Sequence, residues 1–394
     1  MQVERLLHKI LKESSVIGHE KRRMCLLRSV ESVLHNGKLS LTDIGRHLKG
    51  SAKVKNKIKS VDKLVGNTRL MMERAAIYEV ITRRLLEGLR EAVIIIDWSP
   101  CASHENQLLK ASVMMSGRSM TLYEEVHPEK KLGNNAVHKQ FMRRLKRMLP
   151  EGVKIIIETD AGFRTDWFKW VVEMGWEFIG RVRSNMLFCY EGEEEWFPCL
   201  SVFSQATSRV KFLGDVRLSK KRSLPASMYL YHENKVRKKK PTKVKRKIKL
   251  GKMNSSYSRG NKEPWLLVTS LRGGEKSANR IIGHYRNRMR IEHEFRNTKN
   301  SRWGVGLEYT LTRNLERLQI LLLIGYLAIF ILWLTGLAAE LKNLQYNYQA
   351  NTIRKHRVLS LVFLGLQIIL HEPNSITKMD IINAFAKVRA IRGK

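Results

Sequence analysis

Two kinds of hydrophobic pattern alternate along the chain. Uninterrupted or alternating apolar runs, typical of buried strands, occupy residues 91–97, 109–115, 119–126, 153–159, 176–182 and 265–270. Helices are predicted over 20–35, 53–64, 71–90, 136–148, 167–176, 281–302, 320–339, 352–370 and 379–388. The segment 281–302 has no proline and one glycine, and the segment 320–339 has no charge and is apolar throughout. Strand and helix patterns are thus mixed through the middle of the chain, whereas both ends are predicted to be helical.

Residues 1–75 are predicted to form short basic helices. Ser40 and Asp43 have the spacing of a capping box, with Asp in place of Glu or Gln, and predict a short helix that runs to Leu48. After Gly50 comes the lysine-rich amphipathic segment 53–64. This order resembles a helix-turn-helix whose last helix suits a DNA major groove. The alternative is an ordinary basic three-helix subdomain.

Two of the predicted strands deliver an aspartate at their carboxyl ends. The run from Glu91 ends on Asp97, and the run 153–159 is followed by Asp160. Functional groups of a sheet commonly emerge there, although a lone aspartate at a strand end is usually a turn former or a helix cap. Glu158 is a competing acid, but it lies within its strand rather than at the end, so we prefer Asp160.

The helix predicted over 281–302 carries a narrow polar stripe. At about 100° per residue, its members lie within about 60° of one another around the helix axis, whereas Glu294 falls on the opposite side. The stripe consists of Tyr285, Arg288, Glu292 and Lys299. It predicts a carboxylate metal ligand beside groups that bind phosphate. The alternative is a solvated helix face with ion pairs such as Arg288 to Glu292.

The charge of the chain changes the choice of partner. A formal net charge of +37 and a pI near 10.3 imply a polyanionic partner, either nucleic acid or an anionic membrane surface. We expect the densest cationic run, residues 235–249, to form a loop that contacts DNA, with a solvated insert as the alternative. The uncharged segment 320–339 is long enough to span a bilayer, but we favour burial in a protein core.

The four cysteines, at positions 25, 101, 189 and 199, have no zinc-binding or CxxC spacing. We interpret them as reduced thiols of a cytosolic protein.

Asp97, Asp160 and Glu292 together resemble a cradle for two magnesium ions roughly 4 Å apart. Magnesium prefers hard oxygen ligands and keeps positions for water and substrate phosphates. One ion would activate water or a DNA 3′-hydroxyl, and the other would stabilise the leaving 3′-oxygen. Arg288 and Lys299 would hold the scissile and neighbouring phosphates, and Tyr285 would donate a hydrogen bond to a phosphate.

The spacing Tyr285-x2-Arg288-x3-Glu292-x6-Lys299 matches the YREK signature of the insertion-sequence-four family of DDE transposases. The strings IIIDWSP, GRSMTLYEE, ETDAGF, GRVR, EPWLLVTS, RMRIEHEFRNTK, GVGLEYT and QANTIRKHRVLSLVFLG occur in this order within residues 90–370. They are similar to the group that contains the transposase of the tetracycline-resistance transposon Tn-ten. Several ordered motifs agree, so the resemblance is specific.

The resemblance implies the fold and its division. It predicts an α/β protein with an RNase H-like catalytic core, a mixed sheet flanked by helices, over residues 76–340. An all-β insertion would interrupt this core at about 186–264, since the stretch from Asp160 to Glu292 is too long for one strand-to-helix connection. Residues 1–75 would be the DNA-binding domain and 341–394 a helical region that contributes to dimerisation. Asp97, Asp160 and Glu292 would be the catalytic triad and the metal ligands.

The implied activity is cut-and-paste DNA transposition with Mg2+, for which Mn2+ can substitute. The enzyme would bind terminal inverted repeats, cut the element ends through a hairpin intermediate and join the 3′ ends to target DNA. Trp265 matches the position of a stacking wall for a flipped base, and Met289 stands where some members carry a tryptophan probe. The DNA-binding set is therefore Tyr285, Arg288, Lys299, Trp265 and Met289.

The resemblance also implies partners and location. We expect a homodimer in the synaptic complex, no membrane partner, and a bacterial cytoplasmic protein associated with the nucleoid. Two alternatives stay open: an RNase H-like DNA nuclease without strand transfer, and an inactive repressor derived from a transposase.

Overall fold

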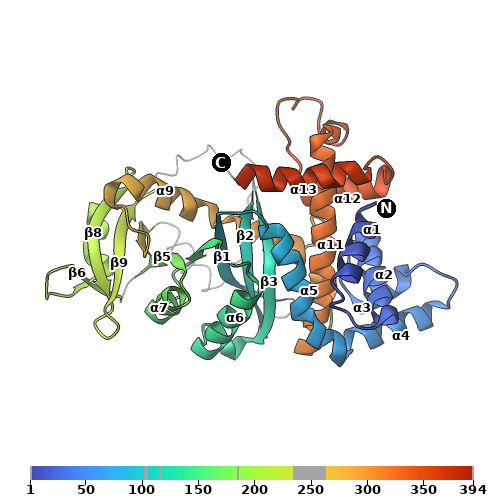
Figure 1. Cartoon of the computed structure of the whole chain (residues 1–394), viewed down its shortest axis with the longest axis horizontal. Helices are drawn as coiled ribbons and strands as arrows, with labels where there is room; N and C mark the ends of the chain where they lie inside the picture. Colours follow the sequence, from blue (N-terminus) through green and yellow to red (C-terminus); the bar gives the residue numbers. More distant parts are fainter. Residues whose placement is uncertain (1, 102–104, 116–117, 184–185, 234–262, 393–394) are drawn as a thin grey trace, which may run out of the picture. The chain divides into compact units, whose positions relative to one another are not determined.

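The computed structural model describes residues 2–392 except 102–104, 116–117, 184–185 and 234–262 (Figure 1). The chain divides into two compact units. Unit 1 combines residues 1–154 with 289–394, and unit 2 is the continuous segment 155–288. Both units contain strands flanked by helices, so the predicted α/β class is confirmed. The cationic run 235–249 lies outside the described residues.

Unit 1 contains an antiparallel meander of three long strands: β1 (Glu91–Pro100), β2 (Asn106–Met115) and β3 (Arg118–Pro128). Apolar side chains such as Ile94 and Leu108 are fully buried in it. The prediction that the first strand ends on Asp97 is wrong. Asp97 pairs with Lys110, and the ladder continues to Pro100 opposite Gln107. The apolar run stops at Asp97, and the prediction therefore ended the strand there. Pairing with β2 continues the strand for three more residues.

Five helices precede the meander: α1 (Gln2–Glu13), α2 (Glu20–Asn36), α3 (Leu41–His47), α4 (Val54–Val65) and α5 (Thr68–Leu86). The capping box before α3 forms as expected, since the Ser40 hydroxyl accepts a hydrogen bond from the Asp43 N–H and donates to its carboxylate. Helices α3 and α4 cross closely at Gly45, where a Cβ would lie 2.6 Å from the Ile58 Cα.

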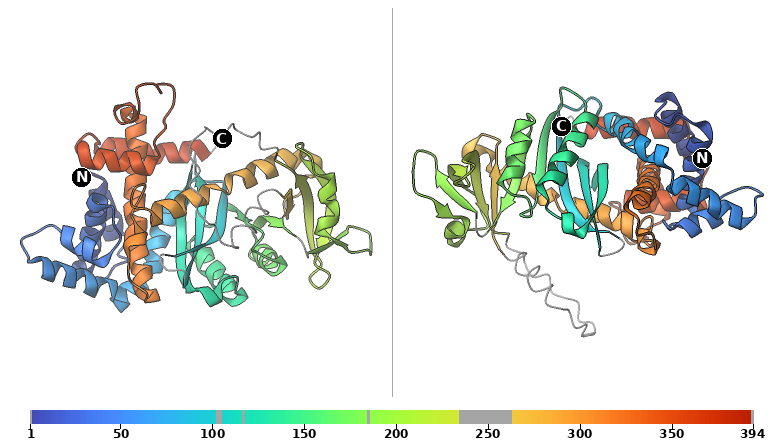
Figure 2. Two further views of the ribbon diagram at one scale, coloured as in Figure 1. Left: turned by 180° about the vertical axis from the view of Figure 1, so that it is seen from behind. Right: turned by 90° about the horizontal axis from the view of Figure 1, so that it is seen from below.

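The centre of unit 1 is α11 (Leu315–Leu341), which packs against α2, α5 and β3 (Figure 2). By length and composition this helix could cross a membrane, but the whole of its most apolar 18-residue window is buried within the protein. Burial, which the sequence analysis favoured, is therefore what the structure has. Helix α6 (Asn135–Met148) also belongs to unit 1 and packs on α5.

Two C-terminal helices, α12 (Leu361–His371) and α13 (Lys378–Arg392), pack on α11. The helix predicted over 352–370 is therefore correct only in its second part, because the helix starts after the Ser360 cap, which accepts from the Phe363 N–H. Helices α11 and α12 approach at two glycines. A Cβ on Gly336 would lie 1.9 Å from the Leu361 carbonyl oxygen, and one on Gly365 would lie 1.9 Å from that of Leu332.

Unit 2 contains one parallel strand pair, β4 (Lys154–Thr159) and β5 (Glu177–Val182), with α7 (Thr165–Glu173) between them. Antiparallel strands extend the sheet from β5 in the order β10 (Trp265–Thr269), β9 (Leu224–Tyr231), β8 (Lys211–Leu218), β6 (Leu187–Tyr190) and β7 (Phe197–Pro198). Helix α9 (Gly274–Asn287) packs on β8 and β9.

The single helix predicted over 281–302 is wrong at its centre. Helix α9 ends at Asn287, and a separate helix, α10 (Arg290–Lys299), begins at Arg290. At the break the Arg288 N–H donates to Tyr285, and the Glu292 N–H donates to Met289, each three residues back instead of four. Both Arg288 and Met289 retain right-handed helical backbone angles, so hydrophobic periodicity gave no sign of the interruption.

Candidate active site

Asp97 lies on β1 and is 7% exposed, and its Oδ1 accepts a hydrogen bond of 2.8 Å from the Trp98 N–H. Ser99, two residues further on, projects from the same face of the strand. The Lys299 ammonium at the end of α10 donates to the Ser99 hydroxyl at 2.6 Å. This bond places the last residue of the predicted stripe beside the strand that carries Asp97.

Helix α10 is fixed to the meander by a buried carboxylate. Glu294 is 1% exposed and accepts hydrogen bonds from the Ser119 hydroxyl at 3.0 Å and from the N–H and hydroxyl of Thr121. Glu292, two positions earlier, is half-buried and takes no part in this anchor. The sequence analysis placed the two glutamates on opposite sides of the helix, and their surroundings agree with that placement.

Charge gathers around Lys299 and Lys110. Burial lowers the pKa of Lys299, and repulsion from Lys110 lowers it further, whereas Cys101 and Glu292 raise it. The last effect places the Glu292 carboxylate within electrostatic reach of Lys299. Lys110 is itself 1% exposed, forms an ion pair of 3.0 Å with Glu124, and donates to the Thr298 hydroxyl at 3.1 Å. The ion pair joins β2 to β3, and the hydrogen bond to Thr298 joins β2 to α10, so Lys110 connects the helix to the meander.

In unit 2, Asp160 directly follows β4 and forms a tight turn. Its Oδ1 accepts a hydrogen bond of 2.8 Å from the Gly162 N–H. The prediction that this aspartate stands at a strand end is confirmed. The competing acid, Glu158, is fully buried within the strand. Asp160 is half-buried and is therefore the acid of this pair that solvent can reach.

Three residues of the predicted site gather near Asp160 in unit 2. The Tyr285 ring on α9 packs edge-on against the Trp265 ring on β10, with 5.2 Å between centroids. The Arg288 guanidinium lies 5.7 Å from the centre of the Tyr285 ring. Burial raises the pKa of Tyr285, Arg288 and Arg181 lower it, and Asp160 raises it. The phenol therefore lies within reach of a carboxylate and two guanidinium groups.

The sequence analysis missed Arg181 as an individual residue, although it quoted the GRVR string that contains it. Arg181 on β5 is 7% exposed and donates to the carbonyls of Glu263 and Pro264 at 3.3 and 3.2 Å. Burial lowers its pKa, and Tyr285 raises it. These bonds fix the start of β10, and with it the position of Trp265.

The other predicted DNA contact, Met289, belongs to unit 1 and is 53% exposed. Trp265 is half-buried between Tyr285 and Tyr231, whose ring centroid lies 5.6 Å away. An aromatic wall of this kind can stack a base, whereas an exposed methionine at a helix break can insert beside one.

Comparison with known families decides the class of this site. A family described as Transposase DDE domain matches residues 88–331, which is more than half of the chain. The chain belongs to this family. The matched segment contains Asp97, Asp160 and Glu292 and runs from the start of the meander into α11. A search of curated proteins finds no match.

Because the chain belongs to the DDE transposase family, its α/β core is of the RNase H-like type. Membership also implies that the partner is DNA and that the cofactor is a divalent metal. In the described part of the chain, no three His, Cys, Asp or Glu side chains gather into a preformed metal site. Asp97 and Glu292 belong to unit 1 and Asp160 to unit 2, so the triad stays a prediction.

The donor chemistry fits magnesium. The predicted set contains only carboxylate oxygens, and a backbone N–H orients each of the two aspartates.

Proposed function

We propose that this transposase excises and inserts its element by two-metal phosphoryl transfer, with Asp97, Asp160 and Glu292 as the catalytic carboxylates. The proposal rests on one observation above all. In unit 2, Asp160 shares its surroundings with Tyr285, Arg181 and Arg288, a carboxylate among donors that bind phosphate. If Asp160 served only in a structural ion pair, one guanidinium would be enough. The second guanidinium and the buried phenol are therefore the features that favour a phosphate-binding site.

The proposed reaction exchanges one phosphodiester bond at a time. A water oxygen bonds to phosphorus as the bond to the 3′-oxygen breaks, which leaves a 3′-hydroxyl at the element end. That hydroxyl attacks the opposite strand, forms a hairpin and releases the flanking DNA. A second water attacks the hairpin phosphorus and releases the 3′-hydroxyl again. That hydroxyl then attacks a target phosphorus as the bond from this phosphorus to the target 3′-oxygen breaks. Magnesium, when bound, supplies Lewis-acid stabilisation of the oxygens that carry charge.

The side chains of the chain itself position the DNA. Arg288 and Lys299 donate to phosphate oxygens, and the guanidinium offers two parallel donors. Tyr285, held by Trp265, donates its hydroxyl to a phosphate. A phenol is protonated at neutral pH at its ordinary pKa, and burial raises the pKa of Tyr285 further, so the hydroxyl is able to donate. Trp265 stacks the base that must leave the duplex for the hairpin to form, and Met289 inserts beside that step.

The surrounding elements are proposed to deliver the DNA. Lys53 is the N-cap residue of α4, and Lys55 and Lys59 lie in its amino-terminal half. All three are exposed, which suits a helix that contacts a duplex. We propose that residues 1–75 bind the terminal inverted repeats in this way. Two subunits would then bring the two ends together, with the helical region 341–394 contributing to the dimer.

The test is cleavage of a plasmid that carries the gene's own flanking DNA. We compare the wild type with Glu292→Gln and with Glu316→Gln, which changes an exposed glutamate of the same unit. With Mg2+ we expect nicks, hairpins and excised fragment from the wild type and the control. Glu292→Gln should bind the DNA within about twofold of the wild type, but cut at least about a thousandfold more slowly.

Each outcome separates the candidate functions. Cutting without hairpins or strand transfer would identify a nuclease of the same fold. Binding by the wild type without cutting, in Mg2+ or Mn2+, would identify a repressor derived from a transposase. Cutting that survives in Glu292→Gln would remove this residue from the proposed triad.

A further inference from the structure

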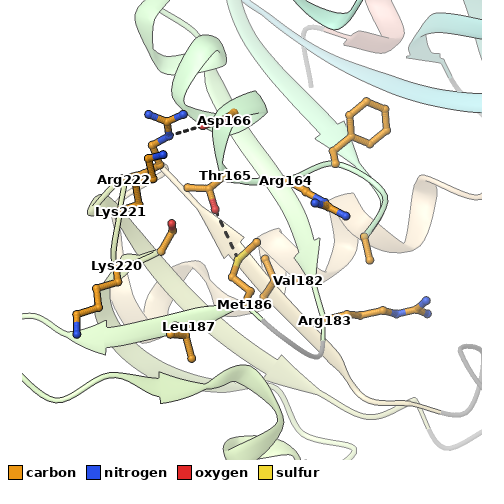
Figure 3. A pocket seen from close by; sticks show the side chains of 13 residues that line it. Arg164, Thr165, Asp166, Val182, Arg183, Met186, Leu187, Lys220, Lys221 and Arg222 are labelled. Carbon is orange, nitrogen blue, oxygen red and sulfur yellow. Dashed lines mark hydrogen bonds and ion pairs between the residues drawn. The ribbon is translucent and has the colours of Figure 1, made fainter. Parts of the chain in front are cut away.

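A basic pocket in unit 2 is not used by the proposed chemistry. It has a volume of about 720 Å3 and begins at Ala161, the residue after Asp160 (Figure 3). Three segments line it: the β4–α7 loop, the end of β5 with the start of β6, and the turn between β8 and β9. Its cationic side chains are Arg164, Arg183, Lys220, Lys221 and Arg222.

The β8–β9 turn is held in a fixed conformation. The Ser219 N–H donates to the Leu187 carbonyl at 2.8 Å, and the Ser223 N–H donates to the Ser219 carbonyl at 2.7 Å. Both serines have positive φ, 62° and 45°, which closes the turn tightly. The three cations between them are therefore presented by an ordered backbone.

The cations stand on two sides of the pocket. In Figure 3, Lys220 and Arg222 extend from the β8–β9 turn on one side of the pocket, and Arg164 and Arg183 lie on the other side. Among the described residues that line the pocket, Asp166 is the one carboxylate, and it pairs with the Nε of Arg222 at 2.5 Å. Lys220 and Lys221 are exposed and form no ion pair with the described residues. Arg183 also pairs with a carboxylate, since its Nε lies 3.2 Å from Glu263. The net positive charge of the pocket therefore comes from Arg164, Lys220 and Lys221.

This net positive charge decides the chemistry of the ligand. A single bound anion would need one or two of these cations, whereas cations on two sides of a pocket far larger than the about 30 Å3 of a water molecule fit a chain of linked anions. Successive phosphodiesters of nucleic acid have that form, and lysine and arginine bind them without regard to sequence.

We propose that this pocket binds the phosphodiester backbone of a DNA strand next to the strand segment that Asp160 acts on. The inference rests on the proposed function, which makes Asp160 a catalytic residue. The strand could come from the element end with its flanking DNA or from the target. The shared chemistry is a run of phosphates, and the arms of the experiment separate the two sources.

The experiment uses the full chain with Lys220→Gln and Lys221→Gln combined. The matched control is Lys169→Gln with Lys276→Gln, which removes the same charge from exposed lysines of unit 2 outside the pocket. One arm measures binding of an end duplex with flanking DNA, and the other measures capture of an unrelated duplex by the preassembled end complex. Both arms are run with a chelator, so that no DNA is cut.

We expect the pocket variant to bind one of the two DNAs roughly tenfold more weakly near 150 mM salt, with the salt slope reduced by about 1 to 2. The arm that shows the loss identifies the strand. Equal losses in pocket variant and control, or no loss in either arm, would overturn the proposal. Thermal unfolding of the variant within about 2 °C of the wild type excludes misfolding as the cause of a loss.

The two proposals fail in different ways. If the wild type does not cut with Mg2+ but the pocket variant still loses DNA affinity, the proposed function fails and the pocket stands. If the wild type cuts normally and the pocket variant binds both DNAs as the control does, only the pocket proposal fails.

Discussion

Glu292 and Glu294 on α10 differ in role although they are two positions apart. Glu294 is buried and accepts three hydrogen bonds from β3. A glutamine at this position has one acceptor oxygen instead of two. Its NH2 group would point at the donors of Ser119 or Thr121, with which it cannot form the same hydrogen bonds. We therefore expect Glu294→Gln to lower the free energy of unfolding by about 2 kcal/mol. Urea denaturation at neutral pH measures this loss.

Glu292→Gln is the control for that measurement, because the Glu292 carboxylate makes no contact in the anchor of α10. Its free energy of unfolding should stay within about 0.5 kcal/mol of the wild type. Equal destabilisation by the two substitutions would contradict the distinction between an anchoring and a catalytic glutamate.

His138 makes stability depend on pH. Its Nε2 accepts a hydrogen bond of 2.9 Å from the Trp98 indole, and burial, with a smaller effect of His127, lowers its pKa from 6.5 to about 4. Between these values the unfolded chain binds the proton and the folded chain does not, so acid favours unfolding. The folded state should lose up to about 3 kcal/mol from this group between pH 7 and 4.

His138→Gln keeps an acceptor for the indole but cannot be protonated, so its stability should change less over the same pH range. Urea denaturation of both proteins at pH 7, 6, 5 and 4 measures the difference. Parallel pH profiles would show that the histidine is not the group responsible.

At the scale of elements, the crossing of α11 and α12 depends on two glycines. The backbones meet at Gly336 and Gly365, where an added Cβ would overlap a carbonyl oxygen. We expect Gly336→Ala or Gly365→Ala to destabilise unit 1 by about 2 kcal/mol or more, despite the better helix propensity of alanine. Thermal unfolding of the full chain measures this loss.

Gly283 on α9 offers the matched substitution. An added Cβ would meet nothing within 4 Å, so Gly283→Ala should stabilise its helix by up to about 1 kcal/mol. Loss of stability in this variant as well would assign the effect to glycine in general rather than to the crossing.

The elements that the sequence predicted well are those with a clear apolar pattern. The limits of α2, α6, β5 and α11 differ by at most five residues from the predicted ones. Helices α2 and α6 bury one face, whereas β5 and α11 are buried over most of their length. The extension of β1 past Asp97 depends on pairing with β2, and the break after Asn287 occurs without a change in polarity. Tertiary context decides both features, and a local pattern does not contain it.

The candidate site divides in the same way. Residue type and spacing were enough to select Asp97, Asp160 and Glu292 as candidates, although Asp97 lies within β1 and not at its end as predicted. The supporting side chains Ser99 and Arg181 were not selected. Their roles come from partners distant in sequence, Lys299 for the first and the residues before β10 for the second.

At the scale of the whole molecule, the net charge of +37 predicts binding that depends steeply on salt. If six or more phosphates are contacted, affinity for an unrelated duplex should fall about a thousandfold or more between about 50 and 200 mM salt. Fluorescence anisotropy at several salt concentrations gives the slope. A slope near zero would contradict a role for the charge in DNA binding.

The division of unit 1 into two sequence segments has a consequence during synthesis. The amino-terminal helices and the meander leave the ribosome early, but their shared core partner α11 follows only after all of residues 155–288. At usual elongation rates the delay is roughly 10–30 s. A nascent or prematurely ended chain therefore has a continuous unit 2 but lacks the core of unit 1 and Glu292. With Glu292 as a catalytic carboxylate, as proposed, a chain that stops before α10 would be unable to cut DNA.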